Sequence, residues 1–307
     1  MAVMASFIII GFILVKLKIV DHGASRILSK LENTVFIPAL AMGTFITNFT
    51  KEKIGIAWRL LLFSFVALLL VIPLAMLFSR LATKSDYIRK IYTYGLSFAN
   101  FGFMGIPVVS ALFPQYEMYY MIFTLPLWTL IYVWGIPSLL MSDGSENKGI
   151  VSKLKALINP MFIALIIGAV IGISGIKLPD FLLTVVGTCS DCMSPIAMII
   201  TGMTFAGISI KKVLSDVSIY FITFVRLIFI PALFGGLYIL GVKIFSLDVP
   251  NYYFVCLMCA LVMPLGLNTV VVPAAYGRDT SVAAGMALIS HVFSLVTVPI
   301  MLTLFGF

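Results

Sequence analysis

Long apolar segments separated by short polar ones run along the whole chain. Segments of this kind predict membrane-spanning helices, because about 20 apolar residues in a helix cross the hydrocarbon core of a bilayer. We place ten spans, at about 2–17, 34–50, 56–79, 91–113, 118–141, 157–175, 190–210, 217–243, 251–276 and 281–306. Two shorter segments, 19–33 and 178–189, are expected at the membrane faces, unless the second belongs to a longer seventh span.

Two of the spans contain residues that interrupt a helix. Residues 263–273 read Met-Pro-Leu-Gly-Leu-Asn-Thr-Val-Val-Val-Pro, and residues 97–107 read Ser-Phe-Ala-Asn-Phe-Gly-Phe-Met-Gly-Ile-Pro. Proline removes an amide donor and glycine loosens the backbone, so both helices should break near the bilayer midplane. Unwound backbone persists in a membrane only where protein or a water-filled cavity satisfies its polar groups. The two breaks are therefore a candidate binding site.

Composition supports an all-α polytopic membrane protein. Of the 307 residues, 62% are hydrophobic and 10% are charged, and the mean hydropathy is +1.16. A soluble domain carries about 25% charged residues. The N-terminal segment lacks a basic region and a small-residue cleavage site, so we expect a first membrane helix and not a removed signal. The net charge is +8, but the basic residues are spread over short loops, which excludes nucleic acid as the expected partner.

The polar segments indicate the topology. Loops on one side carry most of the 20 Lys and Arg residues, so the positive-inside rule predicts both termini outside. Residues 142–156 form the most polar run and divide the chain into a first five-span repeat, 1–141, and a second, 157–307. Five spans per repeat makes the second repeat inverted. The two interrupted spans are then the fourth of each repeat, which is typical of a secondary transporter.

Several of these stretches together resemble the auxin efflux carrier family, which includes bacterial permeases and the plant PIN-formed carriers. The matching residues are 100–107, 159–179, 194–202, 226–231, 263–273 and 290–299. The resemblance implies ten helices in two inverted repeats of five, related to the bile-acid/sodium symporters and sodium/proton transporters. It also implies a scaffold domain and a transport domain, each drawn from both repeats, with two broken helices crossing in spans four and nine. Family members move small organic anions such as auxin, malonate and malate.

The resemblance places a substrate site at the crossover. A broken helix exposes amide groups at its new N-terminus, where the helix dipole favours a carboxylate. Asparagine amides can bind substrate or freed backbone without placing a charge in lipid. The substrate-binding candidates are Asn100, Gly102, Gly105, Pro107, Pro264, Gly266, Asn268, Thr269 and Pro273.

Four further residues are candidates for charge or ion coupling. Arg226 lies inside span eight and should pair either with the substrate carboxylate or with Asp191 or Asp216. Asp191 is either a proton or sodium site or, as we prefer, a helix-start acid at the outer interface. His291 is either a proton relay or a hydrogen-bonded packing residue, and packing is favoured. Ser97 could add a hydroxyl. Arg226 and His291 both depart from the family pattern.

The expected function is secondary active transport of a mono- or dicarboxylate across the bacterial inner (plasma) membrane by alternating access. A receptor or scaffold that binds the anion without transport, a sodium-coupled bile-acid-like symporter and a channel remain alternatives. A membrane protease is disfavoured, because only Ser290 beside His291 hints at a dyad.

Two Cys-x-x-Cys pairs, at 189–192 and 256–259, lie in apolar segments without a histidine, so no metal or cofactor is expected beyond coupling H⁺ or Na⁺. The expected partners are the organic anion, the lipid bilayer and, by analogy with this fold, a second copy in a homodimer.

Overall fold

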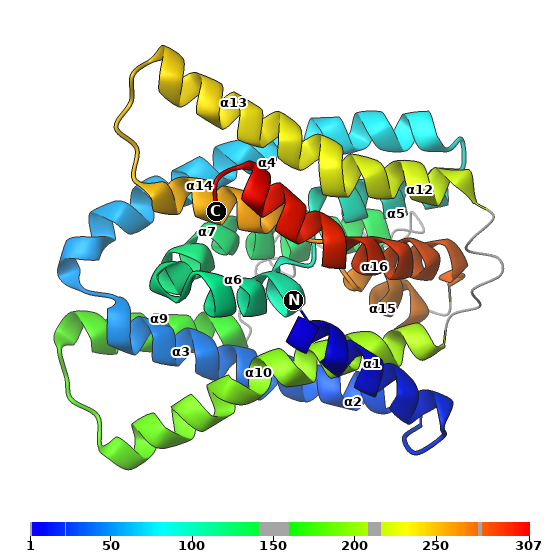
Figure 1. Cartoon of the computed structure of the whole chain (residues 1–307). Coiled ribbons are helices and arrows are strands. Elements are labelled where there is room, and N and C mark those ends of the chain that lie inside the picture. Colours follow the sequence, from blue (N-terminus) through cyan, green and yellow to red (C-terminus); the bar gives the residue numbers. More distant parts are fainter. Residues whose placement is uncertain (1, 22, 141–159, 208–215, 276–277) are drawn as a thin grey trace. The chain divides into compact units, whose positions relative to one another are not determined.

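The computed structural model describes residues 2–21, 23–140, 160–207, 216–275 and 278–307. It is 85% helical, and no strand occurs within these ranges. The α-helices (Figure 1) are α1 Ala2–Lys16, α2 Ala24–Leu31, α3 Ile37–Asn48, α4 Ile54–Ala82, α5 Asp86–Ser97, α6 Ile106–Leu112, α7 Glu117–Leu130, α9 Pro160–Ser174, α10 Asp180–Ala206, α12 Val217–Phe224, α13 Ile230–Ile244, α14 Asn251–Leu261, α15 Asn268–Ala275 and α16 Ser281–Leu304.

Shorter helical turns join several of these helices into longer rods. Four are π-helical: η1 Glu32–Phe36, η3 Phe101–Gly105, η5 Ile131–Leu140 and η6 Val225–Phe229. Two are 3₁₀ turns: η2 Lys51–Lys53 and η4 Pro114–Tyr116. Most of these joins lie close to a proline, which removes one amide donor and so disturbs regular α-helical hydrogen bonding.

Five helical segments of the described chain are long and apolar enough to cross a membrane. They are Lys51–Ala82, Pro114–Leu140, Asp180–Ala206, Val217–Ile244 and Ser281–Leu304. Shorter apolar helices occur at Ala5–Lys16, Phe101–Leu112, Pro160–Ser174 and Asn251–Leu261. Helices of this length and composition are those of a multi-pass membrane protein.

Most of the described helices lie within the apolar segments of the sequence, and five of the ten expected spans coincide with helices long enough to cross a membrane. Residues 178–189 do not form a separate surface helix, because Asp180–Ala206 is one continuous helix, α10. The sequence was compatible with both arrangements, and in the structure the seventh expected span is the longer helix α10. The polar link 142–156, expected as the boundary between repeats, lies outside the described residues.

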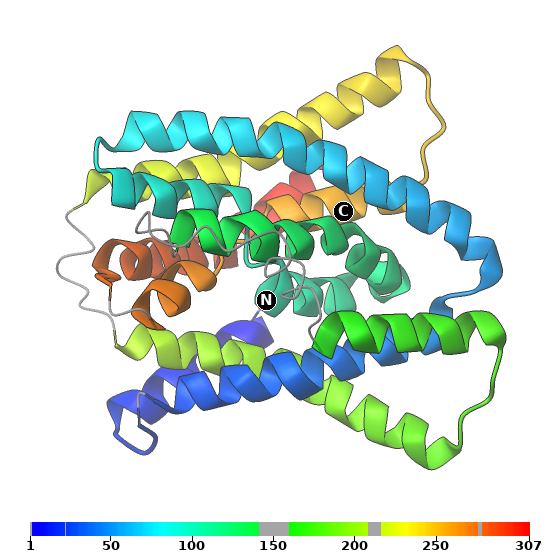
Figure 2. The ribbon, with the colours of Figure 1, turned by 180° about the vertical axis from the view of Figure 1, so that it is seen from behind.

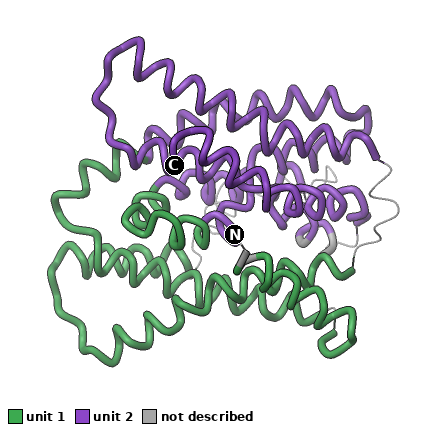
Figure 3. The backbone as a smooth tube through the Cα atoms, in the orientation of Figure 1, with its two compact units in different colours: residues 1–60, 106–122, 148–207 green, residues 61–105, 123–147, 208–307 purple. Residues whose placement is uncertain are grey.

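The chain forms two compact units, each built from both halves of the sequence (Figure 3). Unit 1 contains residues 1–60, 106–122 and 148–207, and unit 2 contains residues 61–105, 123–147 and 208–307. The chain passes from unit 2 to unit 1 between η3 and α6, and it returns to unit 2 within α7. The non-helical residues 98–100, after α5, and 262–267, after α14, therefore both belong to unit 2.

Glycine allows the helices of unit 1 to pack at backbone distance. Helix α10 packs against α1 and α3, and α3 packs against α9, as the ribbon shows from both sides (Figures 1 and 2). A Cβ at Gly202 of α10 would lie 1.9 Å from the Ile8 carbonyl oxygen, and one at Gly11 would lie 2.1 Å from that of Ile199. Small residues at such contacts are a common means of helix association in membranes.

Aromatic side chains fill the contact between α4, α12 and α13 in unit 2. The ring of Phe78 lies 6.2 Å from that of Phe221 and 5.0 Å from that of Phe229. Further along α4, Phe63 stands edge-on to Tyr238 at 6.1 Å. Offset and edge-to-face pairs of this kind add about 0.5–1.5 kcal/mol each beyond the area they bury. These ring contacts hold α4 against α12, η6 and α13 within unit 2.

Replacing Gly202 with alanine tests the contact between α1 and α10. The added Cβ would meet the Ile8 carbonyl oxygen at 1.9 Å, so the helices must separate. We expect a loss of about 1–3 kcal/mol in the free energy of unfolding, the usual cost of overpacking. Thermal unfolding of the detergent-solubilised protein measures it.

The matched control is Gly187→Ala on the same helix, where a Cβ meets no atom within 4 Å. It should be neutral or stabilising, because alanine favours a helix by about 0.5–1 kcal/mol over glycine. Equal melting temperatures for the two variants would contradict the close packing.

Candidate functional site

Two helices of unit 2 stop inside the protein, and the segments that follow them meet. Helix α5 ends at Ser97, and helical structure resumes at η3 after residues 98–100. Helix α14 ends at Leu261, and α15 begins at Asn268 after residues 262–267. The two segments form an antiparallel bridge between Ala99 and Leu265. We call this meeting point, residues 98–100 and 262–267, the crossover segments.

Main-chain and side-chain groups satisfy much of the unwound backbone. The amide of Asn100 donates to the Pro264 carbonyl oxygen over 2.7 Å. The amide of Leu265 donates to the Ser290 hydroxyl over 3.3 Å, and Thr269 Oγ1 donates to the Gly266 carbonyl oxygen over 2.7 Å. Buried backbone groups without partners cost free energy. These contacts explain why the segments can leave helical geometry at a buried position.

Gly266 allows the two crossover segments to approach. A Cβ at this position would lie 2.9 Å from the Phe98 carbonyl oxygen and 3.3 Å from that of Ala99. Gly102 has a similar role at the start of η3, where a Cβ would lie 2.8 Å from Cζ2 of Trp128. Gly102 and Gly266, two of the three candidate glycines, therefore allow close packing around the crossover segments.

The guanidinium of Arg226 joins the ends of both interrupted helices. This side chain comes from η6, is 1% exposed, and donates to three carbonyl oxygens. Nε donates to Met263 over 3.1 Å, Nη1 to Leu96 over 3.0 Å and Nη2 to Ala260 over 2.9 Å. These carbonyls lie at or just beyond the C-terminal ends of α5 and α14, where the helix dipoles are negative. Arg226 therefore supplies a positive charge to two helix C-termini at once.

The partners found for Arg226 are main-chain carbonyl groups, which the sequence interpretation had not considered. The sequence suggested Asp191, Asp216 or a substrate carboxylate, but none of these possibilities included the main-chain carbonyls. Asp216 caps α12, and its Oδ1 accepts from the Ser218 amide over 2.9 Å and the Ser218 hydroxyl over 2.6 Å. A helix that ends inside a span leaves its last four carbonyl groups without a donor in the same helix. This rule could have identified carbonyl groups as the partners of Arg226.

Asn100 and His291 form a buried hydrogen-bonded pair. Asn100 is 3% exposed and His291 is 2% exposed. The Asn100 amide nitrogen lies 2.9 Å from His291 Nε2, and His291 Nδ1 lies 2.7 Å from the Ala287 carbonyl oxygen. His291 was expected to be a packing residue in preference to a functional one. The structure places it in direct contact with the asparagine of the first crossover segment.

Asn268 is the first residue of α15 and contacts a tyrosine. Its Nδ2 donates to the Tyr94 hydroxyl over 3.1 Å, and the side chain is half-buried. The amide groups in the first turn of a helix carry the positive end of its dipole. Asn268 therefore stands where the second interrupted span presents its positive end.

The structure divides the candidates from the sequence between the two units. Those in unit 2 are Ser97, Asn100, Gly102, Gly105, Arg226, Pro264, Gly266, Asn268, Thr269, Pro273 and His291. Among them, Ser97 is 4% exposed and its hydroxyl has no hydrogen-bond partner. It lines a cavity of about 20 Å³ together with Arg226, a space comparable with one water molecule. Pro107 and Asp191 belong to unit 1.

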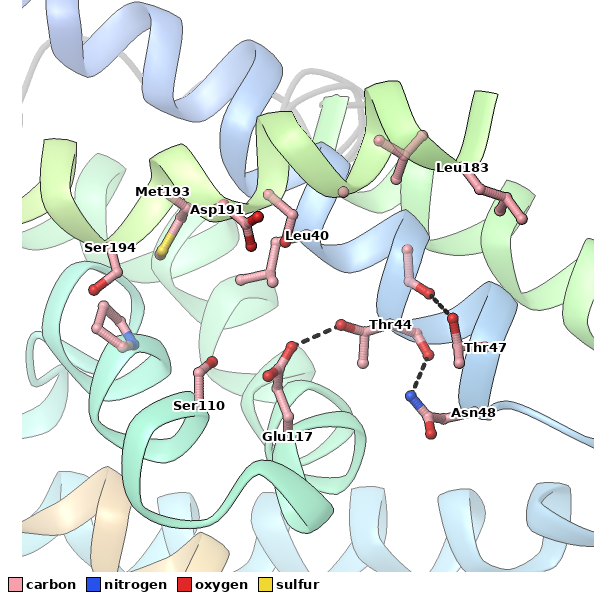
Figure 4. A pocket seen from close by; sticks show the side chains of 15 residues that line it. Leu40, Thr44, Thr47, Asn48, Ser110, Glu117, Leu183, Asp191, Met193 and Ser194 are labelled. Carbon is pink, nitrogen blue, oxygen red and sulfur yellow. Dashed lines mark hydrogen bonds between the residues drawn. The ribbon is translucent and has the colours of Figure 1, made fainter. Parts of the chain in front are cut away.

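Unit 1 contains a larger cavity lined by two carboxylates (Figure 4). Its volume is about 520 Å³, and Glu117 and Asp191 both point into it. Thr44 Oγ1 donates to Glu117 Oε1 over 2.7 Å. The other polar lining residues are Thr47, Asn48, Ser110, Ser190 and Ser194. Such a lining favours a cation or a polyhydroxylated molecule over an anion.

Sequence reasoning missed Glu117. It is the first residue of α7, at the edge of the fifth expected span. An acidic residue at this position is normally interpreted as the start of a helix at the membrane interface. An acidic residue at the N-terminal end of an apolar segment was the available signal. The same signal led us to prefer a helix-start role for Asp191, which was wrong, because Asp191 lies inside α10, Asp180–Ala206. Their common cavity follows only from the packing of α3, α6, α7 and α10.

Replacing Arg226 with methionine tests its role at the helix ends. The variant leaves three buried carbonyls without their donor, and we expect a loss of about 3–5 kcal/mol in the free energy of unfolding, as for a broken buried ion pair. Arg226→Lys keeps the charge on one nitrogen and should lose less.

The matched control is Arg80→Met, at an exposed arginine in the last turn of α4, which should change stability by about 0.5 kcal/mol or less. Thermal unfolding measures all three variants. A wild-type melting temperature for Arg226→Met would show that the three hydrogen bonds do not hold the crossover.

Comparison with known proteins identifies the family. The model of the family described as membrane transport protein matches residues 1–302. This is the domain of the auxin efflux carriers, so the resemblance inferred from the sequence is confirmed. A search of curated proteins found no match. The family is one of transport proteins and not of enzymes. Because the match covers nearly the whole chain, the protein belongs to the auxin efflux carrier family of multi-pass membrane transport proteins.

Proposed function

We propose that the protein is a secondary active transporter that carries a small organic anion, a mono- or dicarboxylate, by alternating access. The family supports transport. The observation that supports an anion is the pair of crossover segments, where two helices end and two begin at a buried point. In this proposal the segments are the breaks of spans four and nine in a fold of ten spans and two inverted repeats.

The charges at the crossover favour a negative ligand. Arg226 donates to carbonyls at the C-terminal ends of α5 and α14, so the negative ends of these two helices are compensated. The N-terminal ends of Phe101–Leu112 and of α15 remain, and their dipoles are positive. A carboxylate between them would be bound without a further charged side chain.

The two asparagines would orient the anion. Each amide nitrogen carries two N–H donors. One of these donates to His291 in Asn100 and to Tyr94 in Asn268. The second donor of each amide is then available to a carboxylate oxygen. We assign unit 2, which holds both interruptions, as the transport domain, and unit 1 as the scaffold. We place the protein in the bacterial inner membrane with both termini outside.

One observation favours a sodium-coupled variant of this function. Glu117 and Asp191 line the same cavity in unit 1 with several hydroxyl groups, and sodium prefers oxygen ligands of this kind, as other hard cations do. A bile-acid-like symporter would bind its cation there. For this reason the test of the proposed function includes sodium as a variable.

The first test is the thermal stability of the purified protein with a panel of mono- and dicarboxylates, with and without sodium. A ligand at 100 times its dissociation constant adds about 2.7 kcal/mol to the stability of the folded state. We expect one or more carboxylates to raise the melting temperature of the wild type. Asn268→Ala should abolish the shift, because it removes an amide donor from the site.

The matched control is Asn251→Ala, at the exposed first residue of α14, which should keep the full shift. An unchanged shift in Asn268→Ala would exclude the crossover as the binding site. No shift from any carboxylate in the wild type would contradict the choice of an organic anion as substrate.

A further inference from the structure

The hydrogen bonds of His291 define its protonation state. A carbonyl oxygen can only accept, so the Nδ1 atom that contacts the Ala287 oxygen must carry a proton. An amide nitrogen can only donate, so the Nε2 atom that contacts Asn100 Nδ2 must present its lone pair. With the Asn100 amide in this orientation, the ring is neutral and carries its proton on Nδ1.

This state determines which end of the Asn100 amide is left for a ligand. While Nδ2 donates to the ring, Oδ1 points to the other side of the amide group. No hydrogen bond to Oδ1 is present among the described residues. Oδ1 can only accept, as can both oxygens of a carboxylate. While His291 is neutral, Asn100 thus offers a ligand one acceptor and only one N–H, which is less favourable for an anion than two N–H donors.

Protonation of His291 changes which atom of the Asn100 amide can face Nε2. An imidazolium donates from both nitrogens, so the Asn100 group facing Nε2 must become Oδ1. A half-turn of the amide exchanges oxygen and nitrogen at nearly the same positions and needs no movement of the backbone. The turn leaves the NH₂ group of Asn100 where Oδ1 had been. Asn100 then presents donors to a carboxylate.

We propose that His291 is a proton-binding site coupled to anion binding through the orientation of the Asn100 amide. This inference rests on the proposed function and deepens it, because it assigns the coupling ion and the residue that binds it. His291 takes up one proton at Nε2, Asn100 turns, and a carboxylate binds to the exposed NH₂ group. The proton and the anion would then move together as a neutral pair.

Charges around the ring support this coupling. The crossover segment 262–267, which has no titratable side chain, contacts α16 through Leu265 and Ser290. Other segments in contact with α16 include α5, α12, α15, η3 and η6. Of these, η3 and α15 carry no titratable side chain, and the others carry Arg226 on η6, Tyr220 on α12, and Asp86, Tyr87, Arg89, Lys90, Tyr92 and Tyr94 on α5. Asp86, Arg89 and Lys90 lie in the first five residues of α5, at the opposite end from its interruption at Ser97.

Arg226 is the permanent charge that shares the crossover with His291. It donates to Met263, and Ser290, next to His291, accepts from Leu265 two residues further on. A second positive charge buried at the same crossover costs free energy unless an anion accompanies it. Proton and anion should therefore bind together, as a symporter requires, and neither should bind well alone.

The direct test is ¹⁵N NMR of the full-length protein labelled at histidine. The chain contains two histidines, and His22→Gln removes the signals of the other one. Acetate and malonate serve as mono- and dicarboxylate probes. Near neutral pH, we expect one protonated and one unprotonated ring nitrogen for His291 without ligand. Both nitrogens should be protonated when a bound probe saturates the site.

The second measurement is the affinity for the same probe between about pH 6 and 8, where carboxylates stay ionised. Wild type and the His22→Gln control should lose affinity as the pH rises, approaching about tenfold per pH unit above the histidine transition. His291→Gln keeps a hydrogen-bonding amide but cannot titrate, so its affinity should be independent of pH.

The outcomes separate the inference from the function on which it rests. Anion binding with a neutral His291 ring, or an unchanged pH dependence in His291→Gln, would overturn the proton site and leave anion binding intact. Failure of every carboxylate to bind the wild type would overturn the proposed function and the inference together. The NMR result does not depend on the folding of His291→Gln.

Discussion

The three hydrogen bonds of Arg226 are the interaction on which the candidate site depends. Two helices that stop inside a protein leave carbonyl groups that water cannot reach, and their dipoles place negative charge at the same point. One guanidinium, almost completely buried, donates to a carbonyl at or beyond each end. Arginine suits this task because its donors are fixed in a planar fork.

The same arrangement gives the crossover its electrostatic character. With the helix C-termini compensated, what remains are the N-terminal ends of the following helices and two asparagine amides. Positive charge is thus provided mainly by backbone dipoles, which stay in place when the ligand leaves. His291 adds a charge that can appear and disappear. The site would then combine a fixed part that favours an anion with one proton-dependent group beside Asn100.

The sequence predicted an all-helical membrane protein because the length of an apolar segment is a local property. It also singled out Asn100 and Asn268, and in the structure Asn100 ends the first crossover segment while Asn268 begins α15 after the second. It could not predict the partners of Arg226, which come from helices more than 30 residues away in either direction. Nor could it predict that Asp191 and Glu117 line one cavity. These relations depend on packing between distant segments, which no short pattern records.

Uptake of a radiolabelled carboxylate into proteoliposomes tests the central claim most directly, because it requires both binding at the crossover and movement across the bilayer. The account predicts saturable uptake that empty liposomes do not show and that Asn268→Ala abolishes while Asn251→Ala retains it. A carboxylate that binds the purified protein at the crossover but never enters the liposomes would contradict transport. That result would identify the protein as a receptor for the anion.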